Sequence, residues 1–304
     1  MSTTGRGFFI QGEGLDLGYL NIRDSTHHED TRQFVDSLWA RYAPLADVHF
    51  REDAMNHFLE RFWEMYVAVT FMERGLELFR VGGEGPEFYF KISQRRIFVE
   101  AVAPGPGTGL DQVPGPQFGV VTKTPTEKIM LRFTHALVEK RKKYLEALRK
   151  DIVRCDDGYL LAINSRGIHH GAGGNTMPYF VQAFLPFGPL AVALDPNTGN
   201  IVDSFHQYRD TVPKQSGQNI STKAFLDSEF QFVSAVLHSR VDCVNCPIEL
   251  GADFCILHNP SAAHGLDPLV FPWSKQLVLR GDELVEVKPI DHCINNGTAV
   301  LSRA

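Results

Sequence analysis

Long apolar runs and a basic leader segment are both missing from this sequence. No apolar stretch approaches the ~20 residues that a helix needs to cross a bilayer. The first residues, MSTTGRGFFIQGEG, contain no basic segment followed by an apolar one, as a secretory signal would. We therefore expect a cytoplasmic protein with no membrane partner.

Cysteine is scarce, and neither sign of charge dominates. Five cysteines in 304 residues are too few, and odd in number, for a disulfide scaffold. The 30 Lys and Arg against 36 Asp and Glu give a formal net charge of −6, which argues against a globally basic nucleic-acid coat. A local basic cleft remains compatible with that charge. With 43% hydrophobic residues, the chain is also too apolar to be disordered.

The chain shows no internal repeat and no hydrophilic linker, so the sequence predicts a single α/β domain over residues 1–304. Residues 1–52 are expected to form an N-terminal extension. Hydrophobic periodicity from 53 to 164 predicts a core in the order helix, three strands, helix and strand. These elements are expected over 53–75, 76–81, 87–92, 96–102, 126–150 and 159–164. The remainder, 165–304, predicts a β-rich elaboration with a hairpin turn at 196–199.

Three acidic residues occupy notable places in this core. Glu64 lies on the first helix, Glu87 follows Gly85-Pro86 at the start of the second strand, and Glu100 interrupts the apolar third strand. A carboxylate that points inward needs a cation or hydrogen-bond donors, because an isolated buried charge is very costly. A divalent ion held jointly by Glu87 and Glu100 would meet that need, and Mg²⁺ often takes only one or two carboxylates besides water and phosphate.

This combination resembles the PD-(D/E)XK, or restriction endonuclease-like, nuclease superfamily, whose core is an αβββαβ unit with a mixed central sheet. Gly85-Pro86-Glu87 is similar to the first motif and Glu100-Ala101-Val102 to the second, while Glu64 matches an acidic residue on the first helix. The resemblance covers about 110 residues and implies a metal-dependent nuclease. Val102 departs from it, because the family has a lysine there.

The helix that follows the three strands offers replacement cations. Lys128, Arg132 and Lys140 are the candidates, and we expect Arg132 and Lys140 to project toward the acidic cluster. Between Glu127 and Asp151 eight lysines and arginines stand against four acidic residues, a surface suited to phosphates.

Each of these residues also has a purely structural interpretation. Glu64 could be a polar position of an amphipathic helix and Glu87 a surface turn residue. Glu100 could point outward from an edge strand. The run from Lys140 to Lys143 could be a solvated helix face.

A second pattern, Cys243-x2-Cys246 followed by Cys255-x2-His258, has the residue types of a Cys₃His zinc site. Cys255 and His258 flank an apolar strand and can point to opposite faces of it. We therefore predict that these four residues do not bind zinc.

The sequence thus predicts a nuclease that cleaves DNA with Mg²⁺ or Mn²⁺ held by Glu87 and Glu100, assisted by Glu64 and one of the three cations. Glu100→Gln is expected to abolish the activity. The rival predictions are a degenerate nuclease fold that binds nucleic acid or a protein partner without cleavage, and a zinc-stabilised binding module. A homodimer is left open.

Overall fold

The computed structural model of the protein describes residues 7–82, 85–171 and 177–287. The α-helices are α1 (Leu17–Asp24), α2 (Glu29–Tyr42), α3 (Phe50–Ala54), α4 (Phe58–Glu73), α5 (Thr126–Arg149) and α6 (Tyr179–Phe184). The strands are β1 (Phe79–Arg80), β2 (Phe88–Ile92), β3 (Arg95–Val102), β4 (Gly158–Asn164), β5 (Phe187–Leu194), β6 (Ile201–Tyr208), β7 (Thr211–Pro213), β8 (Asn219–Ser221), β9 (Ala235–Ser239), β10 (Cys255–His258), β11 (Lys275–Arg280) and β12 (Glu283–Val287). Short 3₁₀ turns are η1 (Thr26–His28), η2 (Gly109–Asp111), η3 (Ala224–Leu226), η4 (Ser228–Phe230) and η5 (Pro268–Val270).

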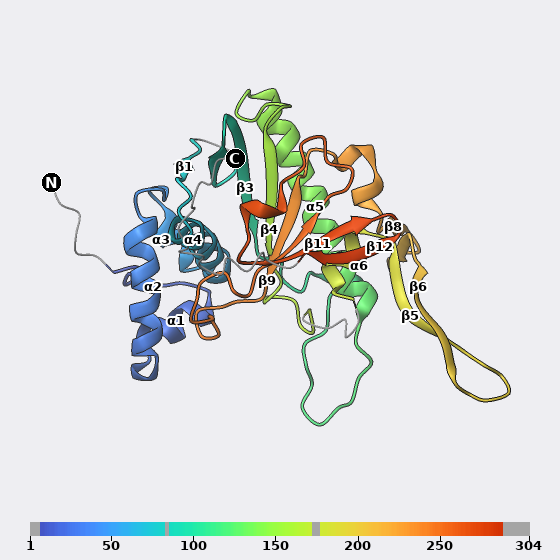
Figure 1. Ribbon diagram of the computed structural model, residues 1–304. Helices are drawn as coiled ribbons and strands as arrows, with labels where there is room; N and C mark the ends of the chain where they lie inside the picture. Colours follow the sequence, from blue (N-terminus) through green and yellow to red (C-terminus); the bar gives the residue numbers. More distant parts are fainter. Residues whose placement is uncertain (1–6, 83–84, 172–176, 288–304) are drawn as a thin grey trace, which may run out of the picture.

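A mixed sheet of eight strands forms the centre of the molecule, in the order β1-β2-β3-β4-β9-β10-β11-β12 (Figure 1). Strands β1, β2 and β3 are an antiparallel meander, whereas β3, β4 and β9 run parallel to one another. The expected mixed α/β class is therefore confirmed, and α4, β1, β2, β3, α5 and β4 follow one another in the predicted order.

Helices α4 and α5 cover opposite faces of this sheet. Strand residues alternate between the two faces: Leu160 packs with the apolar side chains of α4, and Leu161 packs with those of α5. Helix α5 packs on the sheet through an apolar face, in which Ile129, Phe133 and Leu137 are all buried. This sandwich fixes which strand residues face α5, and it thereby determines the site described below.

Some local details differ from the sequence prediction. The long helix predicted from residue 53 is divided into α3 and α4, and Gly75 follows α4 with φ of 84°, a conformation typical of the residue after a helix end. Thr126, where the predicted range 126–150 begins, is the first helical residue of α5, and Pro125 occupies the N-cap position.

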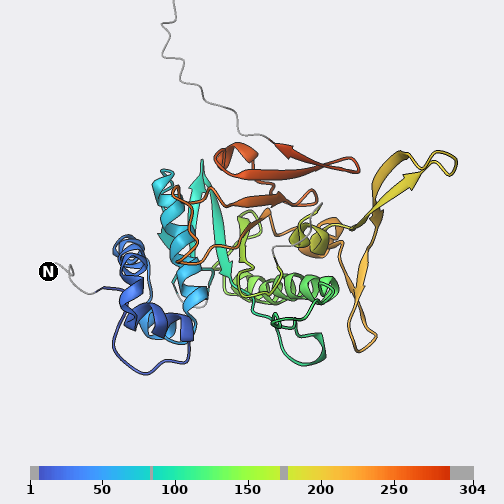
Figure 2. The same cartoon turned by 90° about the horizontal axis from the view of Figure 1, so that it is seen from below.

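A hairpin made of β5 and β6 projects from the body of the molecule, as Figures 1 and 2 both show. Its two strands pair only with each other and form a separate two-stranded sheet. The predicted turn between them is confirmed, with Gly199 at φ of 70°. We call residues 187–208 the arm.

Candidate functional site

The two strand carboxylates lie close together at β2 and β3. The two-residue turn between these strands pairs Ile92 with Arg95, and the register runs on to pair Phe88 with Val99. Glu87 lies just before β2, and its amide donates a hydrogen bond to the Val99 carbonyl oxygen at 3.1 Å. Its carboxylate is close enough to Glu100 for the two charges to interact. Phe88 and Val99 belong to the α4 side of the core, so their neighbours Glu87 and Glu100 face α5.

Glu100 is almost completely buried, with 1% of the residue exposed. Strand β3 lies between β2 and β4, which excludes the interpretation of Glu100 as an outward charge on an edge strand. The Tyr159 hydroxyl, on β4, lies 3.4 Å from Glu100 Oε2. A carboxylate buried in this position requires a cation or hydrogen-bond donors, because water does not reach it.

Lys140 supplies that cation from α5. Its Nζ atom donates to Glu100 Oε1 and lies 3.5 Å from the Ala101 carbonyl oxygen. Val102 is two residues beyond Glu100 in β3, so a lysine there would point to the same face of the sheet. Lys140 reaches that face from the helix that covers it, and Val102 packs in the apolar core instead.

The site lies directly beneath the surface of α5. Lys143, one helical turn after Lys140, has a side chain that is 65% exposed, yet its Nζ atom is 3.7 Å from Glu100 Oε1. The alternative interpretation of this run as a solvated helix face therefore fits Lys143 but not Lys140, of which 9% is exposed. The buried Glu100 carboxylate therefore lies within one side chain of the protein surface, at Lys143.

Glu87 is the carboxylate whose charge is least compensated. Burial, followed by the nearby Glu100 and Glu64 carboxylates, raises the pKa of Glu87 well above its ordinary value. Glu87 is partly exposed, and among the described residues its carboxylate has no hydrogen-bond or ion-pair partner. Burial also disfavours the charge of Lys140, but Glu100 and Glu87 together outweigh that effect and raise the pKa of Lys140. The site therefore holds two carboxyl groups and one ammonium group, and it can accept a further positive charge.

Glu64 belongs to a different set of contacts. It is buried on α4, where it accepts hydrogen bonds from the Tyr42 hydroxyl and from Arg61 Nη1, the latter at 2.9 Å. Burial raises the pKa of Glu64, although both hydrogen bonds oppose that shift. Glu64 lies close enough to raise the pKa of Glu87, but its oxygens are already engaged. We therefore assign Glu64 a supporting role beside Glu87 and Glu100 and do not count it as a metal ligand.

Lys128 and Arg132 are directed away from the carboxylates. Lys128 Nζ donates to the Leu110 carbonyl oxygen at 2.8 Å, and Arg132 Nε donates to the Gly105 carbonyl oxygen at 2.9 Å. Both therefore hold the long Pro- and Gly-rich segment between β3 and α5. Of the three candidate cations, the structure brings only Lys140 to Glu100.

Sequence reasoning missed the residues that support the site. Tyr159 precedes Leu161 by two positions in β4, and Leu161 pairs with Glu100, so Tyr159 shares the face of Glu100. This two-residue spacing would have identified Tyr159 from the sequence if the pairing of β3 with β4 had been known. The contact of Arg61 with Glu64 could have been found from their i,i+3 spacing on one helix. Tyr42 gave no such signal, because its contact with Glu64 depends on how α2 packs against α4.

The oxygen ligands at this site suit a hard divalent cation. Glu87, Glu100 and the Ala101 carbonyl are the kind of ligands that Mg²⁺ and Mn²⁺ accept. Within residues 7–82, 85–171 and 177–287, no group of three or more His, Cys, Asp or Glu side chains is arranged to hold a metal ion. A metal at the Glu87–Glu100 pair would thus need water or substrate oxygens to complete its coordination.

The four residues of the zinc pattern lie on different sides of the sheet. Cys243 and Cys246 pack with the α4 side of the core, whereas Cys255 packs with the α5 side. His258 Nε2 is hydrogen-bonded to Gln276 Oε1 at 2.8 Å. Burial raises the pKa of Cys243 and of Cys255 to about 12, which favours the neutral thiol over the thiolate that zinc requires. The absence of a zinc site at these residues stays a prediction.

Comparisons with models of protein families, with curated proteins and with solved structures give no match to this chain. In the part of the chain that the structure describes, no helix is both long and apolar enough to span a membrane. The case for a function therefore depends on the geometry of the site.

Proposed function

We propose that the protein is a divalent-metal-dependent nuclease with a restriction endonuclease-like core. The observation that carries the proposal is the arrangement of three side chains: Glu87, just before β2, lies close to Glu100 in β3, and Lys140 from the following helix contacts Glu100. The order α4-β1-β2-β3-α5-β4 and the parallel pairing of β3 with β4 agree with the family core that the sequence resembles.

In this proposal Glu87 and Glu100 hold Mg²⁺ or Mn²⁺, with the Ala101 carbonyl as a third oxygen ligand. The ion would lower the pKa of a bound water and stabilise negative charge on a phosphodiester. Lys140 pairs with Glu100 and orients it, and its remaining N–H groups can donate to a water or phosphate oxygen beside the carboxylates. Tyr159 fixes the second oxygen of Glu100.

The proposed substrate is DNA. Lys143 lies at the exposed edge of the site, and Lys142 on the same helix has a side chain that is 62% exposed. Such cations attract phosphates to a protein whose overall charge is −6. A cytoplasmic location is part of the proposal, because the four described cysteines are all unpaired, as is usual in a reducing compartment.

The wild-type protein tests this function directly. With Mg²⁺ or Mn²⁺ we expect it to cleave at least one of single-stranded DNA, double-stranded DNA and RNA, and to lose that activity in EDTA. Calorimetric titration with either metal should give saturable binding. If all three nucleic acids remain intact and neither metal binds, the nuclease proposal is wrong.

One observation favours the alternative, a degenerate nuclease fold that binds nucleic acid or a protein partner without cleavage. The Lys140 ammonium group and Glu100 neutralise each other in a nearly closed space, so the pair is stable without a metal. In that case nucleic acid would bind in EDTA as well as in Mg²⁺ and would remain uncut.

We further propose that the arm joins two copies of the chain into a homodimer. Seven apolar side chains of the arm are each between 42% and 70% exposed, among them Leu194, Ile201 and Tyr208. Together these exposed fractions correspond to about four fully exposed side chains, which at ~100 Å² or slightly more each amount to roughly 400–500 Å² of apolar surface. A stable interface buries ~800 Å² per partner, of which about 57% is apolar. The apolar area of the arm is of the same order, and it is divided between the two faces of the hairpin, because consecutive residues such as Ile201 and Val202 point to opposite faces.

The charge of the arm favours a second copy over nucleic acid as its occupant. Residues 187–208 contain Asp195 and Asp203 and no lysine or arginine, so phosphates would be repelled. We expect sedimentation velocity at micromolar concentration to give a dimer, and Ile201→Glu to give a monomer. Val48→Glu is the matched control, because Val48 is 86% exposed and lies outside the arm. A wild-type protein that stays monomeric at ~100 μM would refute this proposal.

A further inference from the structure

A second group of polar residues lies where two parallel strands end. Strands β4 and β9 are parallel neighbours that end at Asn164 and Ser239. The chain places Arg166 just after β4 and Arg240 just after β9. In open α/β sheets, ligands bind preferentially outside the carboxyl ends of parallel strands.

Arg240 is a partly buried cation without a partner. Its Nε–H group is buried and donates to no acceptor, and its guanidinium group forms no hydrogen bond or ion pair with a described residue. Burial, followed by the charge of Arg166, lowers the pKa of Arg240. A cation that has lost water and gained no partner is costly, and a bound anion would remove that cost.

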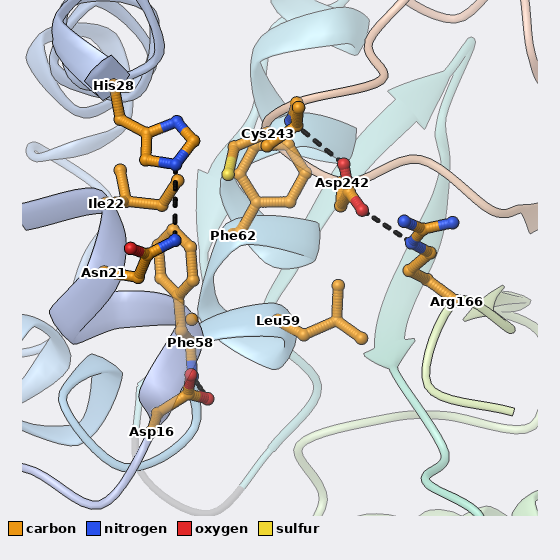
Figure 3. Close-up of a pocket in the computed structure, with 12 residues that line it drawn as sticks. Asp16, Asn21, Ile22, His28, Phe58, Leu59, Phe62, Arg166, Asp242 and Cys243 are labelled. Atoms are coloured by element: carbon orange, nitrogen blue, oxygen red, sulfur yellow. Dashed lines mark hydrogen bonds and ion pairs between the residues drawn. The ribbon is translucent and has the colours of Figure 1, made fainter. Parts of the chain in front are cut away.

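The acidic residues nearby are already occupied. Asp253 accepts hydrogen bonds from the Tyr66 hydroxyl at 2.5 Å and from the Ser239 hydroxyl, one on each carboxylate oxygen. Asp242 forms an ion pair with Arg166 at 2.5 Å, which Figure 3 shows at the rim of a neighbouring hollow. Neither carboxylate pairs with Arg240, so the guanidinium group keeps its hydrogen-bonding capacity.

A cavity of about 260 Å³ adjoins this guanidinium group and is lined by His238, Ser239, Arg240, Val241, Asn245 and Asp253. Burial, followed by Arg240, lowers the pKa of His238 to about 3, so this imidazole is neutral at pH 7 and contributes no charge. The guanidinium group of Arg240 is therefore the group in the cavity that would bind an anion. Its paired N–H donors match the spacing of two phosphate oxygens.

We propose that Arg240, with Arg166 beside it, forms a binding site for a phosphate group at this edge of the sheet. The phosphate has two sources: a nucleic-acid strand or free phosphate. For the strand, the inference rests on the proposed function. Glu100 pairs with Leu161, which pairs with Val236, so Arg240 lies two strands and four residues from Glu100. That separation is about 16 Å, or on the order of four nucleotides of a strand.

The test uses Arg240→Gln, with Arg280→Gln as its matched control, because Arg280 is an exposed arginine at the end of β11. Two probes are applied in EDTA, so that cleavage plays no part: labelled single- and double-stranded DNA followed by anisotropy, and inorganic phosphate followed by the shift of Tm. Wild-type protein should bind DNA at least tenfold more tightly than Arg240→Gln. The slope of log K against log salt should also fall by about 1 in the variant.

The two sources give different results. A loss of DNA affinity in Arg240→Gln, with Arg280→Gln unchanged, supports a strand phosphate. An unchanged DNA affinity, together with a phosphate-induced rise of Tm that Arg240→Gln loses, supports free phosphate as the ligand. If both probes act equally on wild type and Arg240→Gln, or neither acts on wild type, the site does not exist.

Folding and the nuclease proposal are controlled separately. Removing an unpaired buried charge should leave the Tm of Arg240→Gln equal to or above that of wild type. If that variant does not fold, Arg240→Lys keeps the charge but loses the fork, and it should still weaken the binding of whichever probe binds wild type. Binding is measured without metal, so it is independent of cleavage. If DNA or phosphate binds through Arg240 but the protein never cleaves nucleic acid, only the nuclease proposal is refuted. If Arg240→Gln cleaves nucleic acid and binds both probes as wild type does, only the phosphate site is refuted.

Discussion

Glu87→Gln is expected to abolish nucleic-acid cleavage while leaving the protein folded. The substitution keeps the shape of the side chain and removes one of the two carboxylates proposed to hold the metal. We expect activity to fall at least about a hundredfold, which corresponds to about 2.7 kcal/mol of lost transition-state stabilisation. Calorimetric metal binding should weaken in parallel. Glu77→Gln, at an exposed position before β1, is the control and should behave as wild type.

The same variant should change how stability depends on pH. Glu87 has a raised pKa in the folded protein, so above its ordinary value of 4.5 the folded state retains a proton that the unfolded state has released. The wild-type protein should therefore lose stability as pH rises from about 4.5 toward the folded pKa, and Glu87→Gln should lose less. Urea unfolding across this range measures the difference. A larger loss in the variant would show that Glu87 is stabilised by a partner.

Glu100→Gln is a less clean test than the sequence suggested. Glu100 neutralises Lys140, so the substitution leaves a buried ammonium group without its partner and affects folding as well as metal binding. Glu87 lacks such a partner among the described residues, which makes it the better position for separating function from stability.

Lys140→Met should have the largest effect on stability. It removes the cation from two neighbouring carboxylates, and breaking a buried ion pair costs about 3–5 kcal/mol. Chemical denaturation should show this loss, and cleavage should fall with it. Lys142→Met is the matched control: Lys142 and Glu139 form an exposed pair on the same helix, for which about 0–1 kcal/mol is expected.

A double variant separates the structural and catalytic contributions of the pair. Glu100→Gln with Lys140→Met replaces both charges, so most of the lost stability should return while activity stays absent. If Lys140→Met is no less stable than Lys142→Met, the contact between Lys140 and Glu100 contributes little to folding. If the double variant cleaves nucleic acid, the pair is not part of the catalytic site.

The local parts of the site could be predicted because short-range rules determine them. The turn at Ser93-Gln94 joins β2 and β3 directly, and strand alternation then makes Glu87 and Glu100 neighbours on one face. The choice among Lys128, Arg132 and Lys140 could not be predicted in this way. It depends on the long segment before α5, whose carbonyl groups bind the first two cations.

The rest of the sheet was beyond sequence reasoning because its pairings are non-local. Strand β9 lies beside β4, although about 70 residues separate them, and β10 pairs in parallel with β11. No periodicity within a single segment encodes such neighbours. The phosphate site at Arg240 was missed for the same reason, since it depends on β4 and β9 ending side by side.

The position of Lys140 on a helix makes the rotation of that helix part of the site. A lysine in β3 would be aimed by the pleat of the strand, which the sheet pairing holds in place. Lys140 is aimed by the phase of α5, and one residue inserted between Arg132 and Lys140 would turn it by about 100° and move it by about 1.5 Å. The segment between β3 and α5 can vary in length without this effect, because it lies before the helix begins. Substitutions that preserve the phase of α5 are therefore compatible with the site, whereas insertions and deletions within its first half are not.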